Sequence, residues 1–340
     1  MAVTIKQIAE ACNVSRGTVD RVLNNRGRVR EEIAALVREK AEELGYRPNT
    51  AGKALAARKK NYVIGVILTS EGVEFFDEVL NGIRKGQEEI ADYGVTLLVR
   101  SMKGYHVDKQ LALMDEMKDE VQLLILNGIN DDRIADRIRG YMQDGLPVIT
   151  INADVENSGR LCYVGCDFTS SGQTAAGILG LLSGGKATVG VATGTVKVLG
   201  HNQRIHGFSS VCKSKYPDMK VVDIIETNDD DEAGYEQTCL MLKNHPEITA
   251  IYIVAAGAAG VCRAVEESGR ADSILVVASD NTDSVREWMK RGIIKAAVCQ
   301  NPYGQGYRAV QRAADYLIQD IAPTDYIAKN EIRILENIEE

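Results

Sequence analysis

Short apolar segments alternate with longer amphipathic ones over most of this 340-residue chain, and this alternation restricts its fold more than any other feature. Helical segments separate strand segments that are rich in Val, Ile, Leu and Ala. The predicted strands are residues 62–68, 95–100, 123–128, 147–152, 187–193, 250–255, 274–279 and 295–300. Near-continuous apolar strands that alternate with helices are typical of parallel sheets covered on both faces. The pattern therefore predicts an α/β fold with two doubly wound parallel-sheet lobes.

The first sixty residues follow a different pattern, which predicts an all-α helix-turn-helix head before the lobes. Thr4 and Gln7 form a capping-box pattern ahead of a first helix, and Asn13 is the expected turn residue. Ser15 would cap a second helix, and Glu31 to Leu44 reads as a third. The residues expected to face the core of this unit are Ile5, Ile8, Ala9, Cys12, Val19, Val22, Leu23, Ile33, Leu36, Val37 and Leu44.

The second helix is the predicted DNA-reading element, since the N-terminus of such a helix enters the major groove. Arg16 is the favoured base reader because a guanidinium can bond guanine through two donors. Arg21 could read a base or hold phosphate, and Gly17 presents no side chain. Asp20 stands four residues after Arg16, so we expect an ion pair on one helix face in the free protein.

Charge is distributed unevenly along the chain. Residues 1–60 contain 13 Lys/Arg and 7 Asp/Glu, a net charge of +6, whereas the whole chain carries −8 and the remainder therefore −14. A basic head on an acidic body suits phosphate binding by one surface only. The scattered cysteines show no metal-ligand spacing and read as small buried residues or incidental thiols.

The head resembles the DNA-binding head and hinge of the LacI/GalR family. The family's V-S-x-x-T-V-S-R-V-x-N pattern appears at Val14 to Asn24, with Asp20 where Ser is usual, and its Y-x-P-N pattern at Tyr46 to Asn49. The resemblance implies that Leu55 wedges into the minor groove at the operator centre. The predicted DNA contacts are Thr4, Ser15, Arg16, Gly17, Thr18, Arg21, Asn24, Asn49, Lys53, Leu55 and Arg58.

The body resembles the sugar-binding core of that family and of periplasmic sugar-binding proteins. Ligands of open α/β sheets bind beyond the carboxyl ends of the strands, where this chain has short polar residues. Such residues also cap helices, so their individual roles stay open. The resemblance adds an aromatic pair at Phe75 and Phe76, after Glu74 in place of Pro. The predicted effector contacts are Ser70, Phe75, Phe76, Asn127, Asn152, Asp154, Arg204, Asp280 and Gln300.

Two features of the body leave alternatives open. The segment Val254 to Gly260 lacks the Asn-Asp pair usual in the family, so the ligand could be smaller, modified or less polar than an ordinary aldopyranose. Arg204 and Asp280 could instead form a salt bridge between the lobes. His201 and His206 lie near the predicted site, but we expect no metal and no cofactor.

We therefore expect a transcriptional regulator, most simply a repressor, rather than an enzyme. The expected parts are a head (1–48), a hinge helix (49–60), an N-terminal lobe (61–164 plus 300–325) and a C-terminal lobe (165–299 plus 326–340). A cytoplasmic homodimer would bind a near-palindromic operator under control of a sugar-like or polyol effector. The alternatives are an α/β enzyme, against which the absence of GxGxxG and Walker A motifs speaks, and a pure sugar-binding protein with an incidental basic head.

Overall fold

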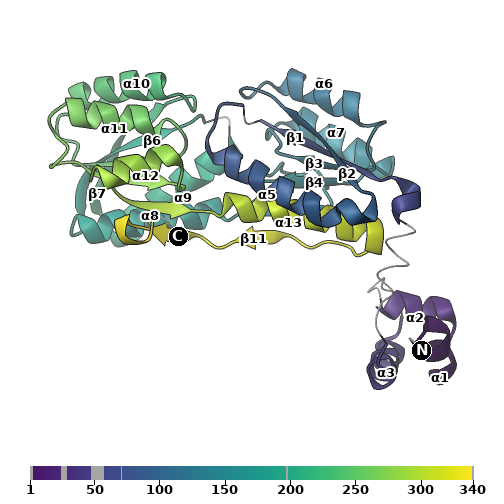
Figure 1. Ribbon diagram of the computed structural model, residues 1–340. Helices are drawn as coiled ribbons and strands as arrows, with labels where there is room; N and C mark the ends of the chain where they lie inside the picture. The colour runs from purple at the N-terminus through teal and green to yellow at the C-terminus, as the bar shows by residue number, and fades with distance from the viewer. Residues whose placement is uncertain (1–2, 24–28, 47–56, 70, 197, 339–340) are drawn as a thin grey trace.

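The computed structural model describes residues 3–23, 29–46, 57–69, 71–196 and 198–338. Two α/β lobes lie side by side, and a small helical head lies beyond the N-terminal lobe, at the end away from the C-terminal lobe (Figure 1). The predicted fold class is confirmed. Within the described residues, no helix is both long enough and apolar enough to cross a membrane.

The head contains α1 (Ile5–Ala11), α2 (Arg16–Leu23) and α3 (Glu31–Glu43). Thr4 and Gln7 form the expected capping box, and the helices enclose a small apolar cluster centred on Ile8, Val19 and Val37. The prediction that Leu36 and Leu44 face inward is wrong, because 37% and 39% of their surface is exposed. The buried stripe of α3 consists of Ala34, Val37 and Ala41, whose spacing places both leucines beside the stripe.

The N-terminal lobe is built on a parallel six-stranded sheet of order β11-β5-β4-β3-β1-β2. Its strands are β1 (Val63–Leu68), β2 (Thr96–Ser101), β3 (Leu123–Leu126), β4 (Val148–Ile151), β5 (Cys162–Cys166) and β11 (Tyr326–Ala328). One face packs on α5 (Phe75–Ile90) and α13 (Pro302–Ala314), the other on α6 (Val107–Met117) and α7 (Asp132–Gln143). Successive residues of a strand point to opposite faces, so the side chains of β1 pack alternately into the apolar cores on the two faces of this sheet.

The C-terminal lobe has a six-stranded sheet of order β12-β10-β9-β8-β6-β7, in which only β12 runs antiparallel. Its strands are β6 (Lys186–Thr193), β7 (Asp218–Glu226), β8 (Ala250–Ile253), β9 (Leu275–Ser279), β10 (Ile294–Cys299) and β12 (Glu331–Arg333). The covering helices are α8 (Phe168–Leu182) and α9 (Leu199–Lys215) on one face, with α10 (Asp231–Asn244), α11 (Ala258–Glu267) and α12 (Asp283–Lys290) on the other.

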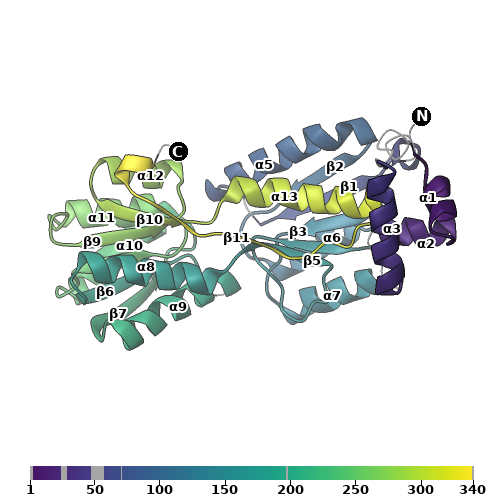
Figure 2. The same cartoon turned by 90° about the horizontal axis from the view of Figure 1, so that it is seen from below.

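The chain passes between the lobes after β5, after β10 and after β11, and Figure 2 shows the last of these passages beside α13. The lobe boundaries that we placed at 164/165 and 325/326 therefore move a few residues further along. The first moves because β5 continues to Cys166, and the other because Tyr326–Ala328 pairs with β5 in the N-terminal sheet. Sequence patterns missed β5, β7, β11 and β12.

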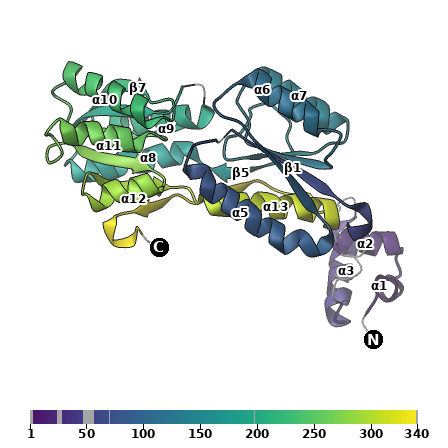
Figure 3. The ribbon, with the colours of Figure 1, turned by 45° about the horizontal axis from the view of Figure 1, so that its top comes forward.

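Glycines set the close approach of the helix pairs that flank the sheets. In the pair α5 and α13, a Cβ on Gly82 would lie 2.0 Å from the Tyr303 carbonyl oxygen, and one on Gly306 would lie 2.1 Å from that of Val79. In the pair α8 and α9, a Cβ on Gly172 would lie 1.9 Å from the Arg204 carbonyl oxygen. Figure 3 shows both pairs running toward the region between the lobes. This packing fixes Phe75 and Arg204, which stand on α5 and α9.

Candidate functional site

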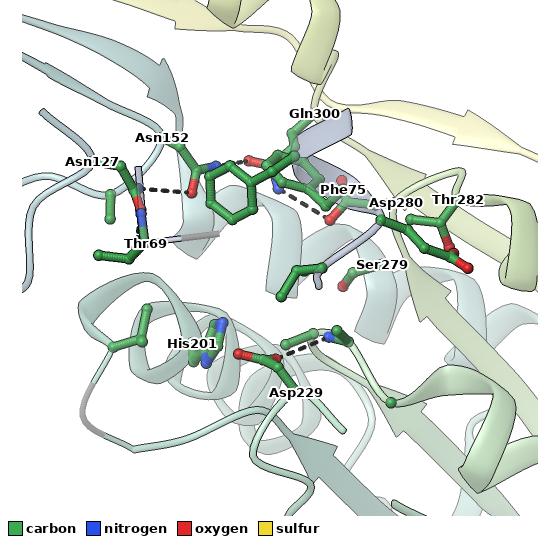
Figure 4. Close-up of a pocket in the computed structure, with 18 of the residues that line it drawn as sticks. Thr69, Phe75, Asn127, Asn152, His201, Asp229, Ser279, Asp280, Thr282 and Gln300 are labelled. Atoms are coloured by element: carbon green, nitrogen blue, oxygen red, sulfur yellow. Dashed lines mark hydrogen bonds between the residues drawn. The ribbon is translucent and has the colours of Figure 1, made fainter. Parts of the chain in front are cut away.

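A cleft of about 1210 Å³, part of it open to solvent, lies between the lobes at the carboxyl ends of their strands. All the predicted effector residues that the structure describes line this cleft, and Figure 4 shows several of them pointing into it. They are Phe75, Phe76, Asn127, Asn152, Asp154, Arg204, Asp280 and Gln300. Ser70 lies outside the described residues. Residues from both sheets thus converge on one cavity.

Arg204 and Asp280 form a buried ion pair on the wall of the C-terminal lobe. Arg204 Nη2 donates to Asp280 Oδ2 at 3.4 Å and Nη1 donates to the Val254 carbonyl at 2.6 Å. The guanidinium also lies over the Phe168 ring, with Cζ 5.1 Å from its centroid. Both charged residues belong to the same lobe, so the alternative of a salt bridge between the lobes is wrong.

Burial shifts the pKa values of both members of this pair. Burial alone would lower the pKa of Arg204, but the Asp280 carboxylate, Tyr252 and Cys166 together outweigh burial, so the pKa is raised. Burial raises the pKa of Asp280, and the Arg204 charge opposes that rise. Arg204 Nε and Asp280 Oδ1 are buried and have no hydrogen-bond partner within the described part of the chain. Because unpaired buried polar atoms are costly, these two are suited to bond a ligand.

A chain of amides links this pair to the N-terminal lobe (Figure 4). Gln300, which follows β10, donates from Nε2 to Asp280 Oδ2 at 3.1 Å and accepts from Asn152 Nδ2 at 3.4 Å. Asn127 donates to the Ile151 carbonyl at 3.1 Å and accepts from the Thr69 backbone N–H at 3.3 Å. The polar groups of the two lobes therefore form one continuous network along the cleft.

Two other predicted contacts are partly engaged elsewhere. Asp154 accepts two hydrogen bonds from Arg160, at 2.6 and 2.7 Å, so its carboxylate is neutralised at the edge of the cleft. Phe76 is only 7% exposed and packs in the core of the N-terminal lobe. Phe75 is half-buried, and its ring packs edge-on against that of Phe76, with 5.2 Å between the ring centroids. Of the aromatic pair, Phe75 is the ring with more surface left for a ligand.

Sequence reasoning missed several residues that line the cleft. Tyr105, which follows β2, donates to Asp229 Oδ2 at 2.7 Å, and Asp229 follows β7 in the other lobe. Ser284 Oγ of the C-terminal lobe donates to Glu74 Oε2 at 2.9 Å. The signal that could have found Asp229 is strand β7, which was not predicted. Asp229 follows that strand, so its prediction would have placed Asp229 at the carboxyl edge of the sheet. Also missed were Phe168, Val198, Leu199, Asp231 and Thr282, whereas His201 lines the cleft, near which it was expected.

His201 is a buried group of the cleft wall. Its Nδ1 lies 3.2 Å from the backbone nitrogen of Thr195. Burial lowers the pKa of His201, and the nearby Asp229 carboxylate opposes this only in part. Among the residues that the structure describes, no three His, Cys, Asp or Glu side chains are grouped so as to hold a metal ion.

The head presents a short polar surface at the start of α2. Ser15 Oγ accepts from the Thr18 backbone N–H at 3.1 Å and lies 2.9 Å from Thr18 Oγ1, so these side chains order the helix start. Arg16 is exposed, whereas Arg21 Nε donates to the Gly17 carbonyl at 3.0 Å. Base reading by Arg16 stays a prediction. Asn24, Asn49, Lys53 and Leu55 lie outside the described residues.

Arg58 stands in a short helical segment, residues 57–60, that contacts the N-terminal lobe. Its Nε donates to the Asp92 carbonyl at 2.6 Å, and its Nη2 lies 3.8 Å from the Asp92 carboxylate. These contacts attach the end of the predicted hinge to the lobe. A DNA contact by Arg58 stays a prediction.

A helix-turn-helix head joined to a two-lobed binding core defines a class of regulators, and comparison with known proteins places the chain within it. Residues 64–320 match the family described as periplasmic binding protein domain, and residues 4–49 match the bacterial regulatory proteins of the lacI family. The chain thus belongs to the periplasmic-binding-protein-like family and carries a LacI-family head.

The similar proteins include both regulators and binding proteins. Catabolite control protein A of Priestia megaterium is 25% identical over 288 residues, which cover 83% of each chain. The probable repressor ExuR of Bacillus subtilis is 26% identical over 256 residues, 74% of this chain and 72% of the relative. A solute-binding protein from Burkholderia graminis, solved with D-arabinose, superposes with a TM-score of 0.77 at 23% identity, covering 82% of this chain and 96% of the other.

These findings establish the general function. The protein is a DNA-binding transcriptional regulator whose core binds a regulatory ligand, and the proteins similar to it are transcriptional regulators and sugar-binding proteins.

Proposed function

We propose that this regulator is a repressor that binds a near-palindromic operator as a homodimer in the cytoplasm, and that a sugar-like polyol in the cleft controls its operator affinity. The observation that carries the proposal is the network Asn152–Gln300–Asp280–Arg204, which offers hydrogen-bond donors and acceptors beside the Phe75 ring. Such a combination suits a hydroxylated ring. The solved binding proteins of similar fold include complexes with D-arabinose and myo-inositol.

The connection between cleft and head supports control by lobe movement. A ligand that contacts both lobes favours their closed arrangement, and it acts only through its different affinities for the open and closed states. Arg58 ties the end of the hinge to the N-terminal lobe at Asp92. In a dimer, rearranged lobes would therefore change the spacing of the two hinges, and with it the fit of two heads to half-sites one helical turn apart.

The experiment that tests this proposal has two stages. Selection from random duplexes with the full-length chain identifies the operator, and fluorescence anisotropy then measures operator affinity with and without D-arabinose, D-glucose, D-galactose and myo-inositol. We expect at least one polyol to change the affinity about fivefold or more. If none of a broad set of polyols did so, the proposed effector class would be rejected.

The predicted base contact of α2 is tested with the variant Arg16→Ala. Loss of a bidentate guanine contact should cost about 1–3 kcal/mol of base discrimination and relax preference at one position in each half-site. Lys243→Ala, which removes a charge from α10 in the C-terminal lobe, is the control and should leave both affinity and preference unchanged. Sedimentation of the complex would show whether two chains bind one operator.

A further inference from the structure

The cleft contains many carboxylates and few cations. Among the described residues that line it, five are acidic and Arg204 is the only Lys or Arg. The acidic residues are Glu74, Asp154, Asp229, Asp231 and Asp280. Low-dielectric walls that carry one sign of charge concentrate its field within a cleft. The charge balance of this cavity therefore constrains what can enter it.

The cations near these carboxylates are already engaged. Asp154 is paired with Arg160, whose Nε lies 2.6 Å from Oδ1, and Asp280 is paired with Arg204 at 3.4 Å. Arg204 is 2% exposed, and one of its terminal nitrogens is bonded to the Val254 carbonyl. It therefore has little capacity to neutralise an incoming anion, although its free Nε can still bond a hydroxyl oxygen.

The other three carboxylates have no such partner. Glu74, Asp229 and Asp231 have no Lys or Arg within salt-bridge distance in the described part of the chain. Besides Arg204, the one basic side chain among the described residues that line the cleft is His201, which is buried and accepts a hydrogen bond from the Thr195 backbone N–H. Glu74 of the N-terminal lobe and Asp229 and Asp231 of the C-terminal lobe thus give the described part of the cleft uncompensated negative charge.

Asp229 is held in position by both lobes. Its Oδ2 accepts from the Tyr105 hydroxyl at 2.7 Å, and its Oδ1 accepts from the backbone N–H of Ala256 at 3.2 Å. Ala255, Ala256 and Gly257, which form the neighbouring wall, offer no polar side chain, so Asp229 supplies the polar group there (Figure 4). Each carboxylate oxygen retains a lone pair for a ligand.

We infer that this cleft selects by charge: it accepts a polyol without an anionic group and rejects phosphorylated or carboxylated sugars, with Asp229 as the main discriminating residue. This inference rests on the proposed function and narrows its effector class. Specificity of this kind depends on repulsion, since an anion would lose its hydration and meet an unpaired carboxylate. Hydroxyl groups can instead donate to Asp229, Asp231 and Asp280.

The test uses matched probes with the full-length chain. Calorimetric titration compares each neutral compound with its anionic derivatives: D-glucose with glucose 6-phosphate and glucuronate, D-galactose with galactose 1-phosphate and galacturonate, D-arabinose with arabinose 5-phosphate, and myo-inositol with inositol 1-phosphate. For any compound that binds, we expect its anionic derivatives to bind at least tenfold more weakly. An anion that binds as tightly as its neutral parent, or more tightly, overturns the inference.

Variants assign the effect to Asp229. Asp229→Asn should narrow the gap between neutral and anionic probes at least threefold, whereas Asp272→Asn, which removes an exposed carboxylate outside the cleft, should leave it unchanged. Asp231→Asn removes a second cleft carboxylate, which is exposed. If Asp229→Asn does not fold, Asp231→Asn is used to measure the affinity gap between neutral and anionic probes. A gap that both cleft variants leave intact rejects the role of these carboxylates.

Two further outcomes separate this inference from the proposed function. Lys197 lies outside the described residues and directly precedes the cleft residue Val198 in sequence. The variant Lys197→Ala is therefore titrated with the same neutral and anionic probes. Tight anion binding that depends on Lys197 would overturn the charge rule. An anion that binds tightly and also changes operator affinity would overturn the charge rule and retain a ligand-controlled regulator. Neutral polyols that bind without changing operator affinity would retain the charge rule and overturn the ligand-controlled regulator.

Discussion

The Tyr105 hydroxyl in the N-terminal lobe donates a hydrogen bond of 2.7 Å to the Asp229 carboxylate in the C-terminal lobe. The lobes cannot separate without breaking this bond. A second bond between the lobes, from Ser284 Oγ to Glu74, has the same property. Both stabilise the arrangement of the lobes in this structure, and the buried hydroxyl of Tyr105 has its pKa raised well above the usual value by burial and by Asp229.

Removing the Tyr105 hydroxyl should weaken effector binding. A hydrogen bond of this kind contributes about 0.5–1.5 kcal/mol, so Tyr105→Phe should reduce effector affinity roughly two- to tenfold by destabilising the closed state. Titration of the effector measures the change. Tyr303→Phe, on the exposed side of α13, is the matched control. Unchanged or tighter binding by Tyr105→Phe would show that the bond does not stabilise the liganded state.

The pair Arg204–Asp280 should separate stability from ligand binding. Arg204→Met leaves Asp280 buried without its countercharge and should cost about 3–5 kcal/mol in the free energy of unfolding. The double variant Arg204→Met/Asp280→Asn removes both charges and should recover much of that loss, while effector binding stays weak. Urea denaturation and titration measure the two quantities. A double variant no more stable than Arg204→Met would contradict the pairing argument.

His201 should make the stability of the protein depend on pH. Because burial lowers the pKa of His201 in the folded state below its usual value of 6.5, the unfolded chain takes up a proton on this residue more readily. Stability should therefore fall as the pH decreases below about 6.5. Thermal melts between pH 7 and pH 5 should show a shallower decline for His201→Gln. The control is His206→Gln, since His206 is exposed. An identical decline in the wild-type protein, His201→Gln and His206→Gln would rule out His201 as the source of the pH dependence.

Gly82 should be intolerant of even one added methyl group. A Cβ there would overlap the Tyr303 backbone at 2.0 Å, so Gly82→Ala should separate α5 from α13 and cost about 1–3 kcal/mol of stability. Gly140 in α7 has no atom within 4 Å of the added Cβ. Gly140→Ala should instead stabilise the protein by about 0.5–1 kcal/mol. Denaturant midpoints check both changes, and a Gly82→Ala protein of unchanged stability would contradict the packing described.

Much of the fold could be predicted because buried parallel strands have a distinct composition. The eight strands predicted from apolar segments all exist, with ends that differ by a few residues. The missed strand β7 lies at an edge of its sheet, and its exposed Lys220 and half-buried Asp223 hide the apolar pattern. β11 and β12 have three residues each, too few to show a period. Their pairing depends on tertiary contacts rather than on local sequence.

The site was predictable where its residues follow recognised strands. Asp280 and Gln300 follow β9 and β10, and Arg204 was indicated by the family pattern. Asp229 and Tyr105 were not predicted, because their roles arise from the approach of two lobes that are far apart in sequence. The partnership of Arg204 with Val254 and Asp280 within one lobe likewise needed coordinates.

The central claim is that a ligand in the cleft controls binding of DNA by the head. The most direct measurement is the dissociation constant of the full-length chain for its selected operator, taken by fluorescence anisotropy at fixed salt with and without saturating polyol. We predict a change of about fivefold or more, lost in the Arg204→Met/Asp280→Asn variant although that variant still binds DNA. An operator affinity that stays the same while calorimetry shows the polyol bound would contradict the claim.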